Sequence, residues 1–544
     1  MRFFTWLFSR RILARMLCGL LTLLTLMVLF YTEEKVRGRR AWNRCRSSLL
    51  QQGYSVEVKT ITPASLPEAQ NFARAPQLKP LYDYVHNQKK TDTNAYQQFQ
   101  TRLDAHITLA KKMGFESFLN SQGMNWRSAT PLNPVSILGK RKQPPQENQE
   151  TPPETHSVQT PPPLTPEAAA KLILEIYQQT NGPLLDELQT EVQRRPDANF
   201  DIQLDTDNPF AILLPHLAFF KSMALKSTSR ALAELYLKQS EAGFKDTLFS
   251  LQLSDALTHE PFLIGGLVQI AMRDITLNAV WHGLATRQWT ASQIVQLQVY
   301  FEKINALAEM YRCLESERIM GNRGIEGFAR QFPHRMTFSS FGGSFDDNND
   351  SFVASSAEIF VSHLYPKGWF YFEQVNYQNL FVECYSKLMS TNQPWLDLKP
   401  LDAASKRVET ELSGQGIKAL FQHKIMSALL LPSLGNAMRK AAISQAAITL
   451  ATTACALERY RLVHNSHPTQ LAELVPQYLK HVPIDPVNGK PLVYRLKSDG
   501  AYILYSLGEN GVDDGGKVVL NKSGINVNLQ AGDWVWTYPE HEAR

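Results

Sequence analysis

The longest apolar run of the chain lies close to its start, at residues 12–31. One charged residue, Arg15, lies within the run, near its beginning. About 20 apolar residues in a helix match the hydrocarbon thickness of a bilayer, and an arginine near the end of such a helix can extend its side chain to the interface. The run therefore predicts an uncleaved transmembrane helix. A cleaved signal peptide is the alternative, but no pair of small residues spaced for cleavage follows the run.

A helical pattern dominates the middle of the chain. From Pro166 to about Phe332, apolar residues recur at intervals of three and four positions. The pattern begins with an N-cap signal, Thr165, and with proline at the first helical position. It predicts an α-helical bundle, or a repeat-like stack of helices, with close helix packing at Gly265 and Gly266.

Two segments of the predicted helical domain have an unusual composition. Residues 337–352 are rich in Gly, Ser, Asp and Asn and predict a solvated surface loop, with cation binding as the alternative. The segment that follows is dense in aromatic residues, which we expect to pack a helix onto the bundle; lining a pocket is the alternative. These aromatic residues are Trp369, Phe370, Tyr371, Phe372 and Tyr377.

The pattern changes again after Lys440. Two short β-type runs, "PLVYRL" and "AYILYSL", are separated by the turn sequence "KSDG". A third run, "DWVWTY" at residues 533–538, can supply another strand. Residues 440–544 therefore predict a small α+β module that starts with a long helix. One face of this helix carries the apolar residues Ile443, Ala447, Leu450, Ala454 and Leu457.

The segment between the juxtamembrane region and the helical domain has a composition of its own. Residues 139–166 are rich in Pro, Gln, Glu and Thr and almost free of apolar residues. Such a sequence buries too little apolar surface to offset the entropy of ordering, which predicts a disordered or polyproline-like linker.

The expected fold is mainly α, in this order: a basic tail at 1–11, a transmembrane helix at 12–31, a partly helical juxtamembrane region at 32–138, the linker at 139–166, a helical domain at 167–439 and the α+β module at 440–544.

Composition and charge narrow the classes of function. With 544 residues, 44% of them hydrophobic, the chain can form two or three folded units with sizeable cores. The net charge of +5 is small and lies largely beside the apolar run, which argues against nucleic-acid binding. Basic residues flank both ends of that run, so the positive-inside rule does not favour a short cytoplasmic N-terminus. The basic residues after the run either lie along anionic lipid headgroups or form a solvated helix face. Five scattered cysteines indicate neither a disulfide framework nor a zinc site.

Candidate catalytic chemistry is sparse. His464 and His467 fit a helix C-terminus, where histidine suits the helix dipole, better than a zinc site, which needs more ligands. His259 and Glu260 are an acid–base pair or, as we prefer, part of a turn between helices. The sequence contains no G-x-S-x-G, P-loop or dinucleotide-binding motif. It therefore names no catalytic residue and leans against an enzyme.

The stretch "YSLGENGVDDGG", residues 505–516, offers a different kind of site. It places Glu509, Asn510, Asp513 and Asp514 among four glycines. Oxygen-bearing side chains of this kind bind hard cations such as calcium, and the same residues favour tight turns. Both interpretations stand, because the EF-hand pattern is absent.

The C-terminal region resembles the globular head of the major pseudopilin of bacterial type II secretion. The long helix, the motif "P-x-D-P-x-x-x-x-P-x-x-Y", two strands and "YSLG-x-[ND]-G" carry the resemblance, over residues 440–516. It implies a long helix packed on a small antiparallel sheet, and a calcium-binding loop after the last strand. The chain departs from that family because its apolar helix lies far upstream without a prepilin-peptidase motif, so polymerisation into a pseudopilus is not expected. The calcium ligands that the resemblance implies are Leu507, through its backbone carbonyl, and the side chains of Asn510, Asp513, Asp514 and Asp533.

The whole chain is also similar to a family of membrane-anchored proteins from planctomycete and verrucomicrobial bacteria. The segments "GRRAWNRCRSSL", "NFARAPQLKPLYD" and "PKGWFY" carry this similarity, which implies an architecture but no activity. We expect a single-pass protein of the bacterial inner membrane, with its large C-terminal part in the periplasm. Its expected role is a scaffold or binding protein whose partners are the bilayer and other envelope proteins. A hydrolase with a site in the helical domain and a scaffold facing the cytoplasm are the alternatives.

Overall fold

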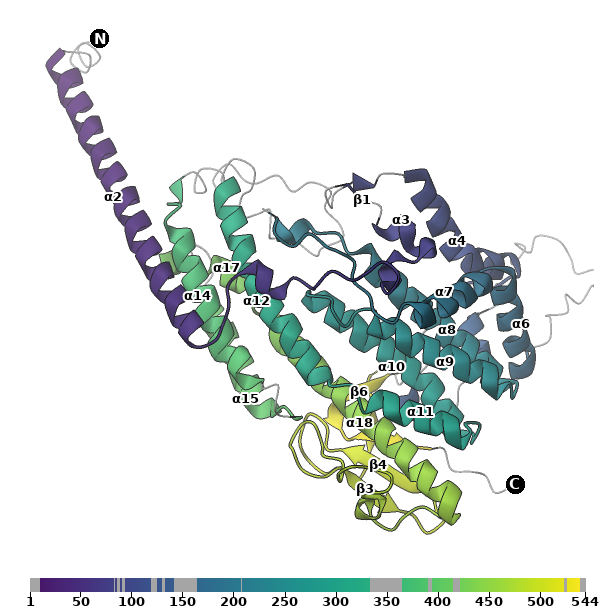
Figure 1. The fold of residues 1–544 in the computed structure, drawn as a ribbon. Helices are drawn as coiled ribbons and strands as arrows, with labels where there is room; N and C mark the ends of the chain where they lie inside the picture. The colour runs from purple at the N-terminus through teal and green to yellow at the C-terminus, as the bar shows by residue number, and fades with distance from the viewer. Residues whose placement is uncertain are drawn as a thin grey trace, which may run out of the picture.

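The structure is a computed structural model that places most of the chain (Figure 1). Within the described residues the fold is mainly helical with a small C-terminal strand region, as predicted. Most of the predicted basic tail, most of the predicted linker and the predicted loop at 337–352 lie outside these residues. The described residues are 10–82, 84–85, 89–90, 93–118, 125–129, 133–140, 164–206, 208–332, 364–389, 394–413, 421–522 and 526–538.

The N-terminal apolar segment belongs to one long helix, α2 (Arg10–Gln51), of 42 residues. Its apolar half extends away from the rest of the protein in Figure 1, and side chains such as Leu20 and Val28 are exposed. In its polar half, by contrast, Glu34 and Trp42 are buried. No proline separates the two halves, so the helix of the apolar segment continues without a break into the body of the protein.

Helix α2 crosses helix α14 (Trp369–Cys384) at a pair of glycines. A Cβ atom on Gly38 would lie 2.3 Å from the carbonyl oxygen of Gly368. A Cβ atom on Gly368 would lie 2.5 Å from the backbone nitrogen of Lys35. Both distances are shorter than a carbon atom tolerates, so only glycine lets the two backbones approach this closely. Of the aromatic residues of this segment, Phe370 and Tyr377 are buried, as predicted for helix packing, whereas Phe370 and Tyr371 also line a groove, as in the alternative.

Polar contacts fix the same crossing. The carboxylate of Glu34 is buried and accepts a hydrogen bond from Trp369 Nε1 at 2.9 Å. It also pairs with Arg37 on its own helix at 2.5 Å. One turn earlier, the hydroxyl of Tyr31 donates to the carbonyl oxygen of Leu364. These directional bonds set the rotation of α2 about its own axis as well as its position.

The remaining helices form one body, most of it on one side of α2 in Figure 1. Helix α6 begins as predicted, because the Thr165 side chain accepts from the backbone N–H of Ala168 and Pro166 is the first helical residue. Helix α8 packs on α9 and α10. The helices are α3 (Lys79–Tyr82), α4 (Thr93–Lys112), α5 (Pro134–Leu138), α6 (Pro166–Gln179), α7 (Gly182–Arg194), α8 (Pro215–Tyr236), α9 (Ser240–Asp255), α10 (Leu263–Ala285), α11 (Ala291–Phe301), α12 (Ala306–Gln331), α15 (Leu398–Leu412), α17 (Ile425–Leu430) and α18 (Leu434–His464).

Helix α18 is the longest helix of the body, and it is shared by the two large hydrophobic clusters. Its first half, with Met438 and Ala442, belongs to the cluster built around α12, α14 and α15. Its second half, with Leu450 and Leu457, belongs to the cluster that includes α8, α9, α10 and α11. The apolar stripe predicted for this helix is therefore buried against the helical domain as well as against the strands.

The glycines of α10 allow a close approach to α12, as predicted. A Cβ atom on Gly266 would lie 2.8 Å from the Sγ atom of Cys313, which belongs to α12. A Cβ atom on Gly265 would lie 2.2 Å from the side chain of Glu260. Larger side chains at these positions would therefore push α10 away from its neighbours.

The C-terminal strands form two small antiparallel sheets. Strands β3 (Val493–Leu496), β4 (Tyr502–Ser506) and β7 (Trp534–Thr537) pair in the order β3-β4-β7, which confirms the predicted hairpin and the third strand. Strand β5 (Val518–Leu520) pairs with β6 (Val527–Gly532), and β1 (Tyr84–Val85) pairs antiparallel with β2 (Lys89–Lys90). Trp536 of β7 is buried against Trp126, with ring centroids 4.9 Å apart. Trp281 of α10 donates a hydrogen bond to the carbonyl oxygen of Thr537 at 3.0 Å, so the three-stranded sheet also packs on the helical domain.

Three of the described helices are long and apolar enough to cross a membrane. The windows in α10 and in the segment containing α18 are 56% and 78% buried inside the protein, whereas the window in α2 is 0% buried. A helix whose apolar surface is already covered by protein gains little from lipid, so α2 is the helix that the bilayer suits best.

Helix α8 carries a buried cation, Lys226. Its side chain is 1% exposed and donates to the hydroxyl of Ser222 on the same helix. Burial lowers the pKa of Lys226 to about 8, although the carboxylate of Asp104 acts in the opposite direction. A buried ammonium that is not fully compensated reduces the stability of the folded state.

We expect Lys226→Met to raise the free energy of unfolding at pH 7 by up to about 3 kcal/mol, because the buried charge disappears. Between pH about 8 and about 10.5 the unfolded chain holds a proton on Lys226 that the folded chain has lost, so this residue makes stability rise with pH there. The variant should lack that rise. Thermal unfolding of the full chain in detergent at several pH values measures both effects. Lys221→Met, on the exposed side of α8, is the control, and equal behaviour of the two variants would contradict the prediction.

Candidate functional site

The segment after β4 is a series of tight turns. Gly508, Gly511, Gly515 and Gly516 all adopt positive φ, between 64° and 81°, which glycine reaches without strain. The side chain of Asn510 accepts a hydrogen bond from the backbone N–H of Val512 at 3.0 Å, as asparagine does in Asx-turns. The turn interpretation of this segment is therefore confirmed in its geometry.

Internal partners occupy two of the three predicted carboxylate ligands. Asp513 forms an ion pair with Arg495 at 2.9 Å and accepts a hydrogen bond from the Tyr505 hydroxyl at 2.8 Å. This bond from Tyr505 is the main cause that lowers the pKa of Asp513. Asp514 accepts from the side-chain amide of Asn510 at 2.9 Å. A cation would have to replace or share these contacts.

The third predicted carboxylate, Asp533, lies deeper. It is 1% exposed, and its Oδ2 atom accepts from the backbone N–H of Gly516 at 2.7 Å. Its Oδ1 atom is buried without a hydrogen-bond partner among the described residues. Burial also raises the pKa of this carboxyl group. Asp533 is therefore the buried member of the predicted set, and one of its oxygens has no internal hydrogen bond among the described residues.

The predicted ligands do not come together as a cluster of metal-binding side chains. In the described part of the chain, no group of three or more His, Cys, Asp or Glu side chains is arranged to hold a metal ion. Leu507, predicted to offer its carbonyl oxygen, uses its backbone N–H to donate to Asp485 at 3.0 Å. Calcium binding at this loop stays a prediction.

Asp485 organises the start of this loop and was not singled out from the sequence. It is buried, and its two oxygens accept from the Ser506 hydroxyl, from the backbone of Val487 and Leu507, and from the side chain of Asn488, at 2.8–3.1 Å. The motif "P-x-D-P" marks this residue in the sequence, but nothing there shows that it reaches the end of β4. Asp485 thus ties the connection before β3 to the loop after β4.

Arg439 ties the same loop to the helical domain. It forms ion pairs with Glu509, at 2.6 Å, and with Asp402 of α15. Glu509 is thereby engaged in a structural contact, and its Oε2 atom is buried without a hydrogen-bond partner among the residues described. The loop is therefore fixed by Arg439 of α18, which α15 positions through Asp402, as well as by its own strands.

The two histidines of the "HNSHP" sequence lie at a helix end, as expected. Helix α18 ends at His464, whose ring stacks on Tyr460 with centroids 4.2 Å apart. His467 lies beyond the helix, and its Nδ1 atom is 3.0 Å from the carbonyl oxygen of Gly500. The two histidines thus have separate structural partners.

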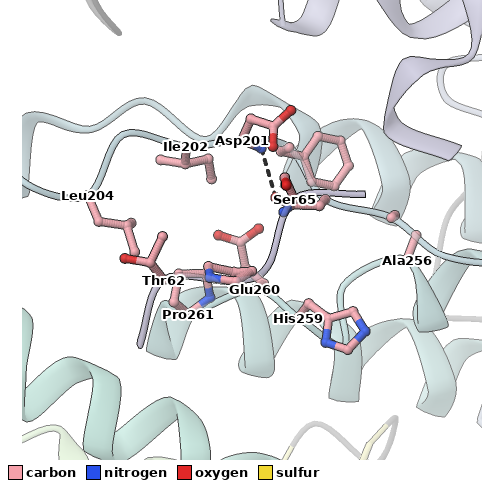
Figure 2. Close-up of a pocket in the computed structure, with 13 residues that line it drawn as sticks. Thr62, Ser65, Asp201, Ile202, Leu204, Ala256, His259, Glu260 and Pro261 are labelled. Atoms are coloured by element: carbon pink, nitrogen blue, oxygen red, sulfur yellow. Dashed lines mark hydrogen bonds between the residues drawn. The ribbon is translucent and has the colours of Figure 1, made fainter. Parts of the chain in front are cut away.

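A cavity of about 270 Å³ opens beside the predicted turn at His259 and Glu260 (Figure 2). Glu260 is buried, and its Oε2 atom lies 2.8 Å from Nε2 of His216, on α8, rather than beside His259. The ring of His216 stacks on Phe200 with centroids 4.0 Å apart. In Figure 2 the ring of His259 and the carboxylate of Glu260 point in different directions, and His259 is exposed. The turn interpretation is confirmed, whereas the acid–base partner of Glu260 is His216.

The chemistry available in this cavity is limited. Glu260 Oε1 is buried with no hydrogen-bond partner among the described residues, so it can accept one from a small ligand. The hydroxyls of Thr62 and Ser65 line the same cavity. Among the described residues, neither hydroxyl forms a hydrogen bond with a histidine or a carboxylate. Without such a base, a hydroxyl is not activated as a nucleophile. The hydrolase alternative stays a prediction.

Calcium titration of the full chain separates the two interpretations of the 505–516 loop. If only turns are present, as the internal bonds favour, millimolar calcium should leave the melting temperature unchanged. If calcium binds, the melting temperature should rise with calcium concentration, because a ligand that binds only the folded state stabilises it. Asp533→Asn should then abolish the rise, whereas Glu187→Ala, an exposed acidic residue far along the chain, should not.

Comparison with known proteins adds no further constraint on this site. No family model matches the chain, and neither the curated proteins nor the solved structures contain a match to it.

Proposed function

We propose that the chain is a single-pass protein of the bacterial inner membrane that holds its helical body at the membrane surface, outside the cytoplasm, as a scaffold or binding protein. The observation that carries this proposal is the dual character of α2. One half of this helix is apolar and exposed, and the other half is bound to the body through the crossing of Gly38 and Gly368.

The docking of α2 distinguishes this arrangement from a flexible tether. A body on a flexible linker samples many orientations, whereas a body packed on its own transmembrane helix keeps a fixed one. The buried Glu34 and the bond from Trp369 to it support the fixed orientation. A fixed orientation is useful for a scaffold, because it presents the same surface to every partner.

The C-terminal region supports a binding role by its position. Its resemblance to a pseudopilin head suggests an element that assembles with other envelope proteins. Exposed apolar side chains in or next to its strands are Leu496, Val512 and Leu520. In Figure 1 these strands lie at the end of the body farthest from the free end of α2. This position is accessible to partners that are not embedded in the membrane.

Reporter fusions test the proposed orientation. Alkaline phosphatase fused after Arg544 should be active, because this enzyme folds only outside the cytoplasm, and a cytoplasm-dependent fluorescent protein at the same place should stay dark. The same fusions on a chain that lacks residues 1–31 are the control and should give the reverse pattern. Fluorescence from the full-length fusion would instead place the body in the cytoplasm.

Gly38→Leu should detach the polar half of α2 from α14, because its side chain would overlap the backbone at Gly368. We expect faster backbone hydrogen exchange in residues 34–51 and 369–384, measured by mass spectrometry on the full chain in detergent. Gly19→Leu is the matched control, because a Cβ atom on Gly19 meets nothing within 4 Å. Equal exchange in the two variants would argue against a docked α2.

A further inference from the structure

A groove of about 600 Å³ runs along the polar half of α2, between α12 and α14. Three basic residues line the groove: Lys35 of α2, Arg330 of α12, and Lys367, which lies just before α14. Its apolar lining includes Trp42 and Tyr371. The groove therefore offers positive charge and apolar surface to the same ligand.

The position of the groove along α2 places it at the membrane surface. The apolar run ends at Tyr31, and Lys35 follows one helical turn later, about 6 Å along the axis. If the run spans the hydrocarbon, Lys35 lies in the headgroup layer.

Aromatic side chains gather at the same depth. Trp369 packs against Phe30, with ring centroids 6.4 Å apart, and against Phe421, at 5.6 Å. Phe421 is 65% exposed. Tryptophan and other aromatic residues favour the boundary between hydrocarbon and headgroups, where an exposed phenylalanine also finds an apolar environment. An aromatic cluster of the body therefore lies beside α2 at the level where the apolar run ends.

The protein neutralises only part of the positive charge of the groove. Lys35 and Lys367 are exposed, and neither forms an ion pair with any described residue. The acidic residue of the groove, Glu326, already accepts hydrogen bonds from Gln374 at 3.1 Å and from Asn322 at 3.3 Å, and it lies 3.9 Å from Arg330. Two lysines remain available to an anion.

We propose that this groove binds the headgroup phosphate of an anionic glycerophospholipid. The inference rests on the proposed membrane-spanning role of α2. The phosphate lies between Lys35 and Lys367, the glycerol region lies over Tyr371, and the acyl chains follow the exposed apolar face of α2. A free phosphate would use the charge but leave the apolar surface uncovered, so the lipid is the better ligand. The bound lipid would then fill the angle between the transmembrane helix and the body.

Native mass spectrometry of the full chain in neutral detergent tests the proposal. After delipidation, phosphatidylglycerol should bind with one site of clearly higher affinity than phosphatidylcholine. Lys35→Ala/Lys367→Ala should weaken that binding about 25-fold, at about fivefold for each lysine. The control, Lys399→Ala/Lys480→Ala, removes the same charge from exposed positions on α15 and near the sheet, and should bind as the unaltered chain does. Inorganic phosphate at equal concentration should not displace the lipid.

The outcomes separate this proposal from the one on which it rests. Equal binding of the two lipids, equal weakening in both double variants, or displacement by free phosphate would each overturn the lipid site. Extraction of the protein from membranes by alkaline carbonate would instead overturn the membrane-spanning role of α2. Retention in the membrane without lipid preference would leave the anchor standing and reject the groove.

Discussion

The backbone contact between Gly38 and Gly368 is the constraint on which the arrangement of this protein depends. A helix that crosses a bilayer must keep its backbone hydrogen bonds within itself, so it enters the aqueous phase as a stiff rod. Helix α2 continues for several turns beyond the apolar run. It meets the start of α14 at Gly38 and Gly368, where neither segment carries a side chain. The buried Glu34 and its bond from Trp369 add direction to that contact. Helix α2 and the body are therefore one structural unit.

Helix α18 plays the corresponding role inside the body. It passes from the cluster around α14 to the cluster around α10, and its C-terminal half also packs on the strands. The C-terminal region is consequently tied to the helical domain through its longest helix, through the Arg439–Glu509 ion pair and through the hydrogen bond from Trp281 to Thr537. A change at the Gly38–Gly368 contact, at the approach of α10 to α12 or in α18 would alter packing across the body, because most other elements contact these helices.

Local patterns in the sequence were sufficient for the elements but not for their contacts. The apolar run, the N-cap at Thr165 and the hairpin of β3 and β4 follow from neighbouring residues, and the structure confirms them. By contrast, Glu34 and Trp369 are 335 positions apart, and neither carries a pattern that names the other.

The candidate sites show the same limit. Glu260 was paired with its neighbour His259 in the sequence, yet its partner in space is His216, 44 positions away. Asp485 was visible as part of a motif, but its bonds to Ser506 and Leu507 depend on how the chain folds back. For the 505–516 loop, the sequence predicted the turns that glycine makes, whereas the pairing of Asp513 with Arg495 required the sheet.

In the proposed transmembrane arrangement, the continuity of α2 also couples the body to the thickness of the membrane. A transmembrane helix whose apolar length exceeds the local hydrocarbon thickness tilts to bury that length, and it stands upright where the bilayer is thicker. When a flexible linker joins a body to its transmembrane helix, tilting of the helix does not change the orientation of the body. If α2 spans the bilayer as we propose, the helix and the body turn together, and the lipid composition around α2 sets the angle at which the strands at the far end face their surroundings.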